Sequence, residues 1–386
     1  MQSGIIAVAI REIKRIAVSK ICIWGILVVP MLAMFILLYM MNEGLPHKIP
    51  VVVVDQDNTS TSRALVRQLD AFPKTNIQFK SLSFREARLR MEREEVYAVL
   101  SIPKNFTRDA LNGQQPKLVY YTNNAFFVSG NLLFQDLRTI TMLASASVGL
   151  KTALAKGFTE RQVMPLIQPI SVDSHILGNP WTNYSICLNT SVLPSILQLI
   201  IFIFTVSAFG SEVKSGQGNA LMSLGNHRIL SVIIGKLLPY TILYLLISLL
   251  YISVMFYYNA FPLKSGFFPL FLGYFCLILG AQGMGLVFVA VFQNYRMGLS
   301  MASLMGMLSF SLTGFSFPVE AMHPSLQAIS YLFPMRHFFL IYVSQALDGF
   351  PIGYVAYHFA ALLGFALLGL LLASKVRYFL SQAYEE

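Results

Sequence analysis

The sequence has few ionisable residues and very few cysteines. Only 12% of its 386 residues are charged, about half the share typical of soluble proteins. The three cysteines form no CxxC pair, which argues against a zinc site or a redox motif. The GxxxxGK[ST], GxSxG and HExxH patterns are also absent, so no P-loop ATPase, serine hydrolase or zinc protease of these types is indicated.

The sequence contains several long runs of apolar residues. Hydrophobic residues make up 55% of the chain, and each run is about long enough to cross a bilayer as a helix. The first run is too long for a signal-peptide core, so we expect it to be retained. The pattern predicts a polytopic α-helical membrane protein with six spans: Ile16–Met41, Val192–Phe209, Leu230–Tyr257, Phe267–Phe292, Leu299–Phe317 and Tyr354–Ala373.

A large polar insertion, residues 42–186, separates the first span from a bundle of five spans within 187–386. It alternates short β-branched runs with amphipathic stretches, which predicts an α/β or α+β domain. The expected helices begin near Thr59, at Phe84, after Pro103 and at Phe127, the last running to Lys156. The expected strands are Ile49–Val54, Asn76–Phe79, Val96–Ile102, Lys117–Thr122 and Ile170–Leu177.

Asp55 and Asp57 follow the first of these strands. Two carboxylates at a strand end are able to bind a ligand. A turn followed by a helix cap is the simpler explanation, and we favour that interpretation.

Basic residues mark one side of the membrane, as in cytoplasmic loops. They predict that both termini are cytoplasmic and that 42–186 is extracytoplasmic. We therefore read the net charge of +10 as a topology signal, with attraction to membrane lipid and no nucleic-acid partner. The basic residues in question are Arg11, Lys14, Arg15, Lys20, Lys214, Arg228, Arg296, Lys375 and Arg377.

The first twenty residues (1–20) read as an amphipathic helix at the membrane surface. Apolar side chains occupy one face and charged ones the other. The expected apolar face is Ile5, Ile6, Ala9, Ile10 and Ile13, opposite Arg11, Glu12, Lys14 and Arg15.

Within the spans, the exceptions to the apolar pattern are Lys236, expected to snorkel towards the surface, and His358. Ion-coupled carriers need intramembrane Asp, Glu or His, and channels need a filter or charged ring. Any transport therefore requires energy from another polypeptide. The polar stretch Ser211–Gly225 is either a segment that such a partner grips or an ordinary loop.

Two stretches carry a family resemblance. Leu312–Pro324, with Gln327, Leu332 and Pro334 beyond it, resembles the signature near the end of ABC-2 type permeases, the membrane subunits of one class of ABC exporters. Val53–Ser60 resembles the start of the outer domain in the drug-efflux-like branch. Glu212 with Gly216 is similar to the motif before the family's coupling helix, although Gly216-Gln217-Gly218-Asn219 replaces the usual Gly-Thr pair.

The resemblance implies an ATP-driven exporter of a hydrophobic or amphiphilic compound in the bacterial inner membrane. A separate ABC ATPase would bind ATP and Mg²⁺, and this chain would hold no cofactor and do no catalysis. A second permease would pair with it, as a homo- or heterodimer, and a periplasmic adaptor with an outer-membrane channel would complete the route in a Gram-negative host. The segment 211–228 would couple to the ATPase, through Glu212, Gly216, Asn219, Leu221, Leu224 and Arg228.

The stretch 318–349 is broken by prolines and charges, and family members place short re-entrant or outer-surface helices there. Phe315, Phe317, Glu320 and Arg336 are candidates for a substrate exit path, with ordinary packing as the open alternative. Another class of function also remains open. The chain would then be a membrane-anchored receptor or assembly scaffold whose outer domain binds an envelope partner.

Overall fold

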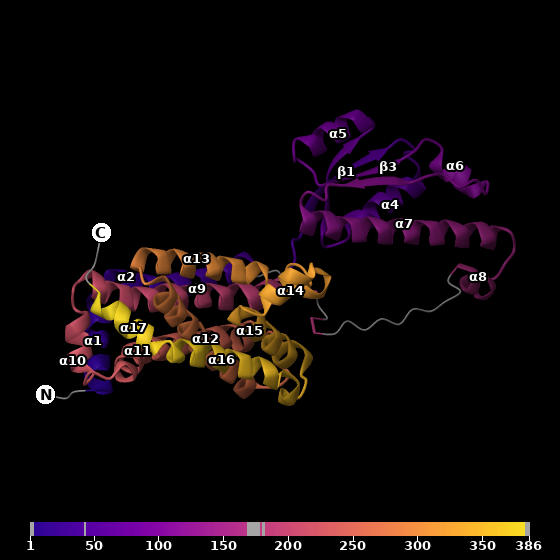
Figure 1. Cartoon of the computed structure of the whole chain (residues 1–386). Coiled ribbons are helices and arrows are strands. Elements are labelled where there is room, and N and C mark those ends of the chain that lie inside the picture. The colour runs from indigo at the N-terminus through magenta and orange to yellow at the C-terminus, as the bar shows by residue number, and fades with distance from the viewer. Residues whose placement is uncertain (1–3, 42–43, 168–177, 180–181, 383–386) are drawn as a thin grey trace. The chain divides into compact units, whose positions relative to one another are not determined.

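The structure is a computed structural model that describes residues 4–41, 44–167, 178–179 and 182–382. It divides into a helical unit, Met1–Asn42 with Ile176–Glu386, and an inserted unit, Glu43–His175 (Figure 1). The inserted unit ends earlier than the expected residue 186. Helix α9 already begins at Tyr184, because the Asn183 side chain accepts hydrogen bonds from the backbone N–H groups of residues 185 and 186.

The inserted unit is built on a mixed four-stranded sheet in the order β2-β1-β3-β4. β1 is parallel to β2 and β3, whereas β4 is antiparallel to β3. Its elements are β1 (Ile49–Asp55), α4 (Ser60–Asp70), β2 (Thr75–Ser81), α5 (Phe84–Glu92), β3 (Ala98–Ile102), α6 (Phe106–Leu111), β4 (Val119–Thr122), α7 (Phe127–Ala155) and α8 (Glu160–Ile167).

The central strand β1 is buried on both faces, which explains its unbroken run of valines. Val51 and Val53 pack with α4, α6 and α7, whereas Val52 and Val54 pack with α5 on the opposite face. Figure 1 shows α5 on one side of the sheet and α4 with α7 on the other. The expected strand Ile170–Leu177 lies outside the described residues.

Asp55 and Asp57 serve the turn and the helix cap. Asp55 accepts the backbone N–H groups of Asp57 and Asn58 at 3.0 and 2.9 Å. Thr59 and Ser62 form a capping box at the start of α4. Asp57 Oδ2 accepts the hydroxyl groups of Thr59 and Thr107, at 2.7 and 2.6 Å, and so ties α4 to α6.

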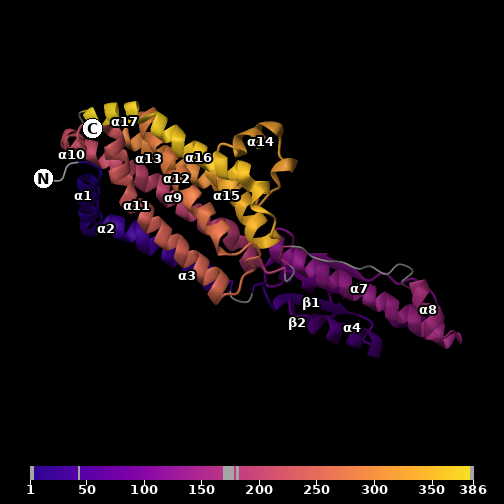
Figure 2. The same ribbon diagram turned by 90° about the horizontal axis from the view of Figure 1, so that it is seen from below.

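In the helical unit, five helices among the described residues are long and apolar enough to cross a membrane: Lys20–Met40, Tyr184–Lys214, Ile229–Tyr258, Phe267–Phe292 and Ile352–Leu371. The predicted fold class, a polytopic helical membrane protein with an inserted domain, is confirmed. Figure 2 shows these helices running side by side. The remaining named elements are α1 (Ile5–Val18), α2 (Lys20–Ile23), η1 (Trp24–Val28), α3 (Val29–Met40), α9 (Tyr184–Lys214), α10 (Gly218–Leu224), α11 (Ile229–Ile252), η2 (Ser253–Tyr258), α12 (Phe267–Phe292), α13 (Tyr295–Ser311), η3 (Val319–Ala321), α14 (Pro324–Ser330), α15 (Pro334–Tyr342), η4 (Val343–Asp348), η5 (Ile352–Val355), α16 (Ala356–Leu371) and α17 (Ala373–Ser381).

The expected span Leu299–Phe317 differs from the structure. It forms α13, which has 17 residues and ends at Ser311, so it rises only about 25 Å. The chain turns at Gly314, whose φ of 91° suits glycine and ends regular helix. Apolar composition continued to Phe317, but backbone geometry stopped the helix earlier.

Helix α12 is the centre of the helical unit and contacts α9, α11, α13, α15 and α16. Its closest approach is to α16, where a Cβ on Gly283 would meet the backbone of residues 365 and 366. Glycine at such crossings lets two helices in a bilayer pack backbone to backbone. The broken stretch 318–349 contributes α15, which is buried against α12 and α16.

We expect Thr107→Val to loosen the start of α6. The substitution removes a hydroxyl donor to Asp57 and should lower the free energy of unfolding by about 1 kcal/mol.

The same hydrogen bonds make this contact depend on pH. Burial raises the pKa of Asp57, but hydrogen bonds from Thr107 and Thr59 outweigh it and hold the pKa below the usual 3.8. Their stabilisation is therefore present above pH 3.8 and is lost as the pH falls through the lower folded-state pKa.

Hydrogen–deuterium exchange of the full chain at neutral pH measures this effect. Backbone exchange in Phe106–Leu111 should quicken in Thr107→Val. It should stay unchanged in the control Thr139→Val, whose hydroxyl donates only within its own helix. Equal exchange in both variants would contradict the assigned role of Thr107.

Candidate functional site

Five charged side chains meet where α1, α9 and α11 come together; we call them the charge cluster: Arg11, Glu12, Arg15, Glu212 and Lys236. Their three positive and two negative charges leave a net charge of +1. Glu12 and Glu212 are 1% exposed and Lys236 is fully buried. Figures 1 and 2 both place α1 and α10 at the same end of the helical unit.

Lys236 bridges the two carboxylates. Its Nζ lies 2.6 Å from Glu12 Oε2 and 2.8 Å from Glu212 Oε1. Glu12 Oε1 also accepts the Tyr240 hydroxyl at 2.8 Å. The expectation that Lys236 snorkels to the surface is therefore wrong, because two buried anions hold its ammonium group inside the bundle.

The two arginines close the cluster from α1. Arg15 Nη1 is 2.6 Å from Glu212 Oε1, and its other terminal nitrogen donates to Ser211. Arg11 Nη2 donates to Glu212 Oε2 at 2.8 Å and to Gln217 Oε1 at 2.7 Å, just before α10. Among the described residues, both carboxylates are fully engaged, which is typical of a structural ion-pair network rather than a vacant site for a coupling ion.

Only part of α1 matches its expected amphipathic pattern. Val8 and Glu12 are buried against the bundle, whereas Ile6, Ile10 and Ile13 are exposed. Glu12 was expected on a polar face in water. It turns inward because Lys236 and Tyr240 on α11 provide the partners that a buried carboxylate needs.

Helix α10 is anchored on its inner face and open on its outer face. Leu221 is completely buried, and a Cβ on Gly218 would meet the backbone carbonyl of Leu380. Gly4 N–H donates to Leu224 O at 2.8 Å, which links α10 to the start of α1. The exposed outer residues are Asn219, Ala220 and Ser223.

The structure thus separates the six candidate coupling residues. Gly216, with φ of 67°, makes the exposed turn between α9 and α10. Asn219 is exposed, and Arg228 is exposed at the start of α11. Leu224 is half-buried, whereas Glu212 and Leu221 face inward and present no surface to another protein.

Sequence reasoning missed Glu12, Lys236 and Tyr240 as parts of this site. One signal was visible: Lys236 interrupts an otherwise apolar run, and such a charge needs a partner inside the bundle. The identity of that partner was not visible, because Glu12 lies 224 residues away in the chain.

Of the four candidate exit-path residues, the structure brings Glu320 and Arg336 into contact. Arg336 Nη1 donates to Thr313 O at 2.7 Å, and its Nη2 lies 3.3 Å from Glu320 Oε1. Phe315 packs edge-on against Phe339, whereas Phe317 is exposed. Arg336 therefore fixes the turn after α13, and its guanidinium is engaged by protein oxygens.

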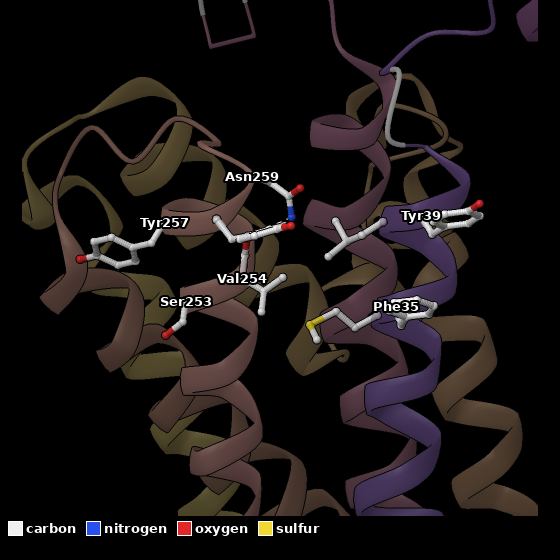
Figure 3. Close-up of a pocket in the computed structure, with 9 residues that line it drawn as sticks. Phe35, Tyr39, Ser253, Val254, Tyr257 and Asn259 are labelled. Carbon is white, nitrogen blue, oxygen red and sulfur yellow. Dashed lines mark hydrogen bonds between the residues drawn. The ribbon is translucent and has the colours of Figure 1, made fainter.

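A second feature is an apolar groove with a volume of about 830 Å³ between α3 and η2. Figure 3 shows Val254 and Asn259 facing α3 across the gap, whereas Tyr257 projects away from it. Exposed aromatic side chains surround the groove, as at membrane–water boundaries. Its lining is Met34, Phe35, Leu38, Tyr39, Ser253, Val254, Tyr257, Tyr258 and Asn259.

Comparison with known proteins gives one finding. A family model described as ABC-2 family transporter protein matches residues 20–375. No curated protein matches the chain.

Lys236→Met should destabilise the helical unit by about 3–5 kcal/mol, because it leaves two buried carboxylates short of a cation. Thermal unfolding of the purified chain in detergent measures the loss. Adding Glu12→Gln to Lys236→Met should recover part of it by removing one of those charges. Lys375→Met, at an exposed position on α17, is the control. Equal unfolding midpoints for Lys236→Met and Lys375→Met would show that the charge cluster does not stabilise the helical unit.

Proposed function

Because the chain belongs to the ABC-2 family of transporter proteins, we propose that it is the permease of an ATP-driven exporter and that its ATPase docks on α10. Family membership makes the chain an ABC transporter membrane subunit and implies a separate ABC ATPase. The proposed contact is the exposed turn at Gly216 with Asn219, Ala220, Ser223 and Arg228. ATP and Mg²⁺ would be held by the ATPase.

The charge cluster is the observation that carries this proposal. A force applied to α10 reaches α1 through the Gly4–Leu224 hydrogen bond and through Gln217, which accepts from Arg11. It then reaches α9 and α11 through Glu212 and Lys236. The contacts of Glu212 with Arg11, Arg15 and Lys236 are charge-assisted and resist stretching, so ATP-driven movement of α10 would shift three helices together.

Leu221 has a supporting role in this scheme. The family resemblance placed it among the residues that couple to the ATPase. Since Leu221 is buried in the helical core, a polar substitution there would disturb α10 itself. The exposed positions beside it are therefore the sharper test of docking.

We place both termini and α10 in the cytoplasm and residues 42–186 outside, in a bacterial inner membrane. The basic residues of α1 and α17, and those on either side of α10, support this orientation. Two permeases would pair, and the inserted unit would meet an adaptor and outer-membrane channel where the host has an outer membrane. Transport would run outward.

The groove between α3 and η2 supports an amphiphilic cargo. Its lining is mainly apolar, and Ser253 and Asn259 bring polar groups to it. An alkyl or aromatic part would lie against Met34, Leu38 and Val254, while a polar head would reach Asn259. This arrangement suits a drug- or lipid-like compound entering from the bilayer.

Ala220→Arg should abolish docking without unfolding the chain, since residue 220 is exposed on a helix and arginine is a good helix former. We expect at least a tenfold loss of the P-loop ATPase that copurifies with the tagged chain in mild detergent. The matched control is Ala155→Arg, the same change at an exposed position at the end of α7 in the inserted unit. Full ATPase recovery with Ala220→Arg would exclude this docking face. Recovery of no ATPase with the unmodified chain, but of an envelope protein instead, would favour the scaffold.

Val254→Trp should fill part of the groove and reduce export of amphiphiles, while ATPase binding stays intact. The expected readout is at least a fourfold loss of resistance to an apolar cationic dye in cells that depend on this transporter. Leu246→Trp, which places the same tryptophan side chain at an exposed position on α11 outside the groove, is the control. Equal resistance in both variants would remove the groove from the cargo path.

A further inference from the structure

Two histidines from different elements meet at the α15–α16 contact. His337 lies on α15 and His358 lies on α16, and both views show these helices side by side (Figures 1 and 2). The Nδ1 atoms are 3.1 Å apart, and the ring planes are inclined by 47°.

The backbone fixes the tautomer of His337. Its Nε2 lies 3.0 Å from the carbonyl oxygen of Tyr331, and only an N–H on Nε2 makes that contact favourable. Nδ1 then carries the lone pair and points at His358. A histidine whose far nitrogen donates to a backbone carbonyl has the arrangement that orients imidazole ligands in metal sites.

The spacing fits a chelate. Zinc–imidazole bonds of about 2.05 Å and the observed 3.1 Å between the Nδ1 atoms give an N–metal–N angle of about 98°. That value lies between square-planar and tetrahedral geometry, so Cu²⁺, Ni²⁺ and Zn²⁺ are all accommodated. To bind, His358 would change tautomer: its Nδ1 would give up the proton shared with His337 while its Nε2 takes one up from water, which leaves the Nδ1 lone pair free for the metal.

Access and charge are compatible with this chemistry. His337 is 1% exposed, whereas His358 is half-buried beside the exposed Tyr357, so a metal would approach from the His358 side. The positive charge of Arg336, next to His337 in the chain, works against a cation here, and its ion pair with Glu320 and its hydrogen bond to the Thr313 carbonyl reduce that repulsion. No group of three or more His, Cys, Asp or Glu suited to a metal occurs among the described residues, so water would complete the coordination.

We propose that His337 and His358 form a two-histidine binding site for a divalent transition metal, which clamps α15 to α16. The site is separate from the charge cluster, α10 and the groove, and it does not depend on the proposed ATPase contact. Binding at such a site stabilises the folded chain by mass action.

Cu²⁺ is the sharpest probe, because its electron paramagnetic resonance spectrum counts coordinating nitrogens. The chain should be purified without a histidine tag and treated with chelator. One equivalent of Cu²⁺ should bind with a signal from two imidazole nitrogens, and Zn²⁺ added in place of Cu²⁺ should raise the unfolding midpoint. His358→Gln should weaken Cu²⁺ binding at least tenfold. His323→Gln, at an exposed histidine outside this contact, should bind as the unmodified chain does.

The unfolding midpoint of His358→Gln without metal shows whether the variant still folds normally. A midpoint close to that of the unmodified chain, together with lost two-nitrogen coupling, supports the site. If His358→Gln does not fold, the unmodified chain alone decides through its nitrogen count. Absence of stoichiometric Cu²⁺ binding, a one-nitrogen spectrum, or equal binding by His358→Gln would each overturn the proposal and leave a plain histidine–histidine hydrogen bond.

Discussion

The helical unit depends on neutralising charge away from water. Lys236 is fully buried between Glu12 and Glu212, and an ion pair of this kind is favourable only when every partner stays in place. The cluster therefore fixes α1 against α9 and α11. It also leaves α1 able to present Ile6, Ile10 and Ile13 outward, where they suit a membrane surface.

Helix α10 is held rigidly by its contacts with the rest of the helical unit. The helix is short, yet its inner face is locked by the buried Leu221 and by the close contact of Gly218 with the end of α17. A seven-residue helix has little stability alone, so its shape comes from the bundle beneath it. A partner that binds its outer face meets a rigid surface joined to three long helices, which is what force transmission requires.

Elsewhere the structure uses polar groups to fix turns within apolar surroundings. Arg336 holds the turn after α13 through Thr313 and Glu320. In the inserted unit, Asp57 joins α4 to α6 through two hydroxyl groups. The inserted unit has its own apolar core around β1, separate from the core of the helical unit.

The sequence by itself determined the fold class, because apolar runs of bilayer length and strand–helix alternation are local patterns. It also revealed the start of α4, since Thr59 and Ser62 cap it with side chains three residues apart. Tertiary structure decided the rest. Composition did not show that α13 ends at Ser311, because the turn depends on Gly314 and Arg336 together. The partners of Lys236 and the meeting of His337 with His358 join residues far apart in the chain. The hydrophobic periodicity of one helix does not identify the residues that pack against it.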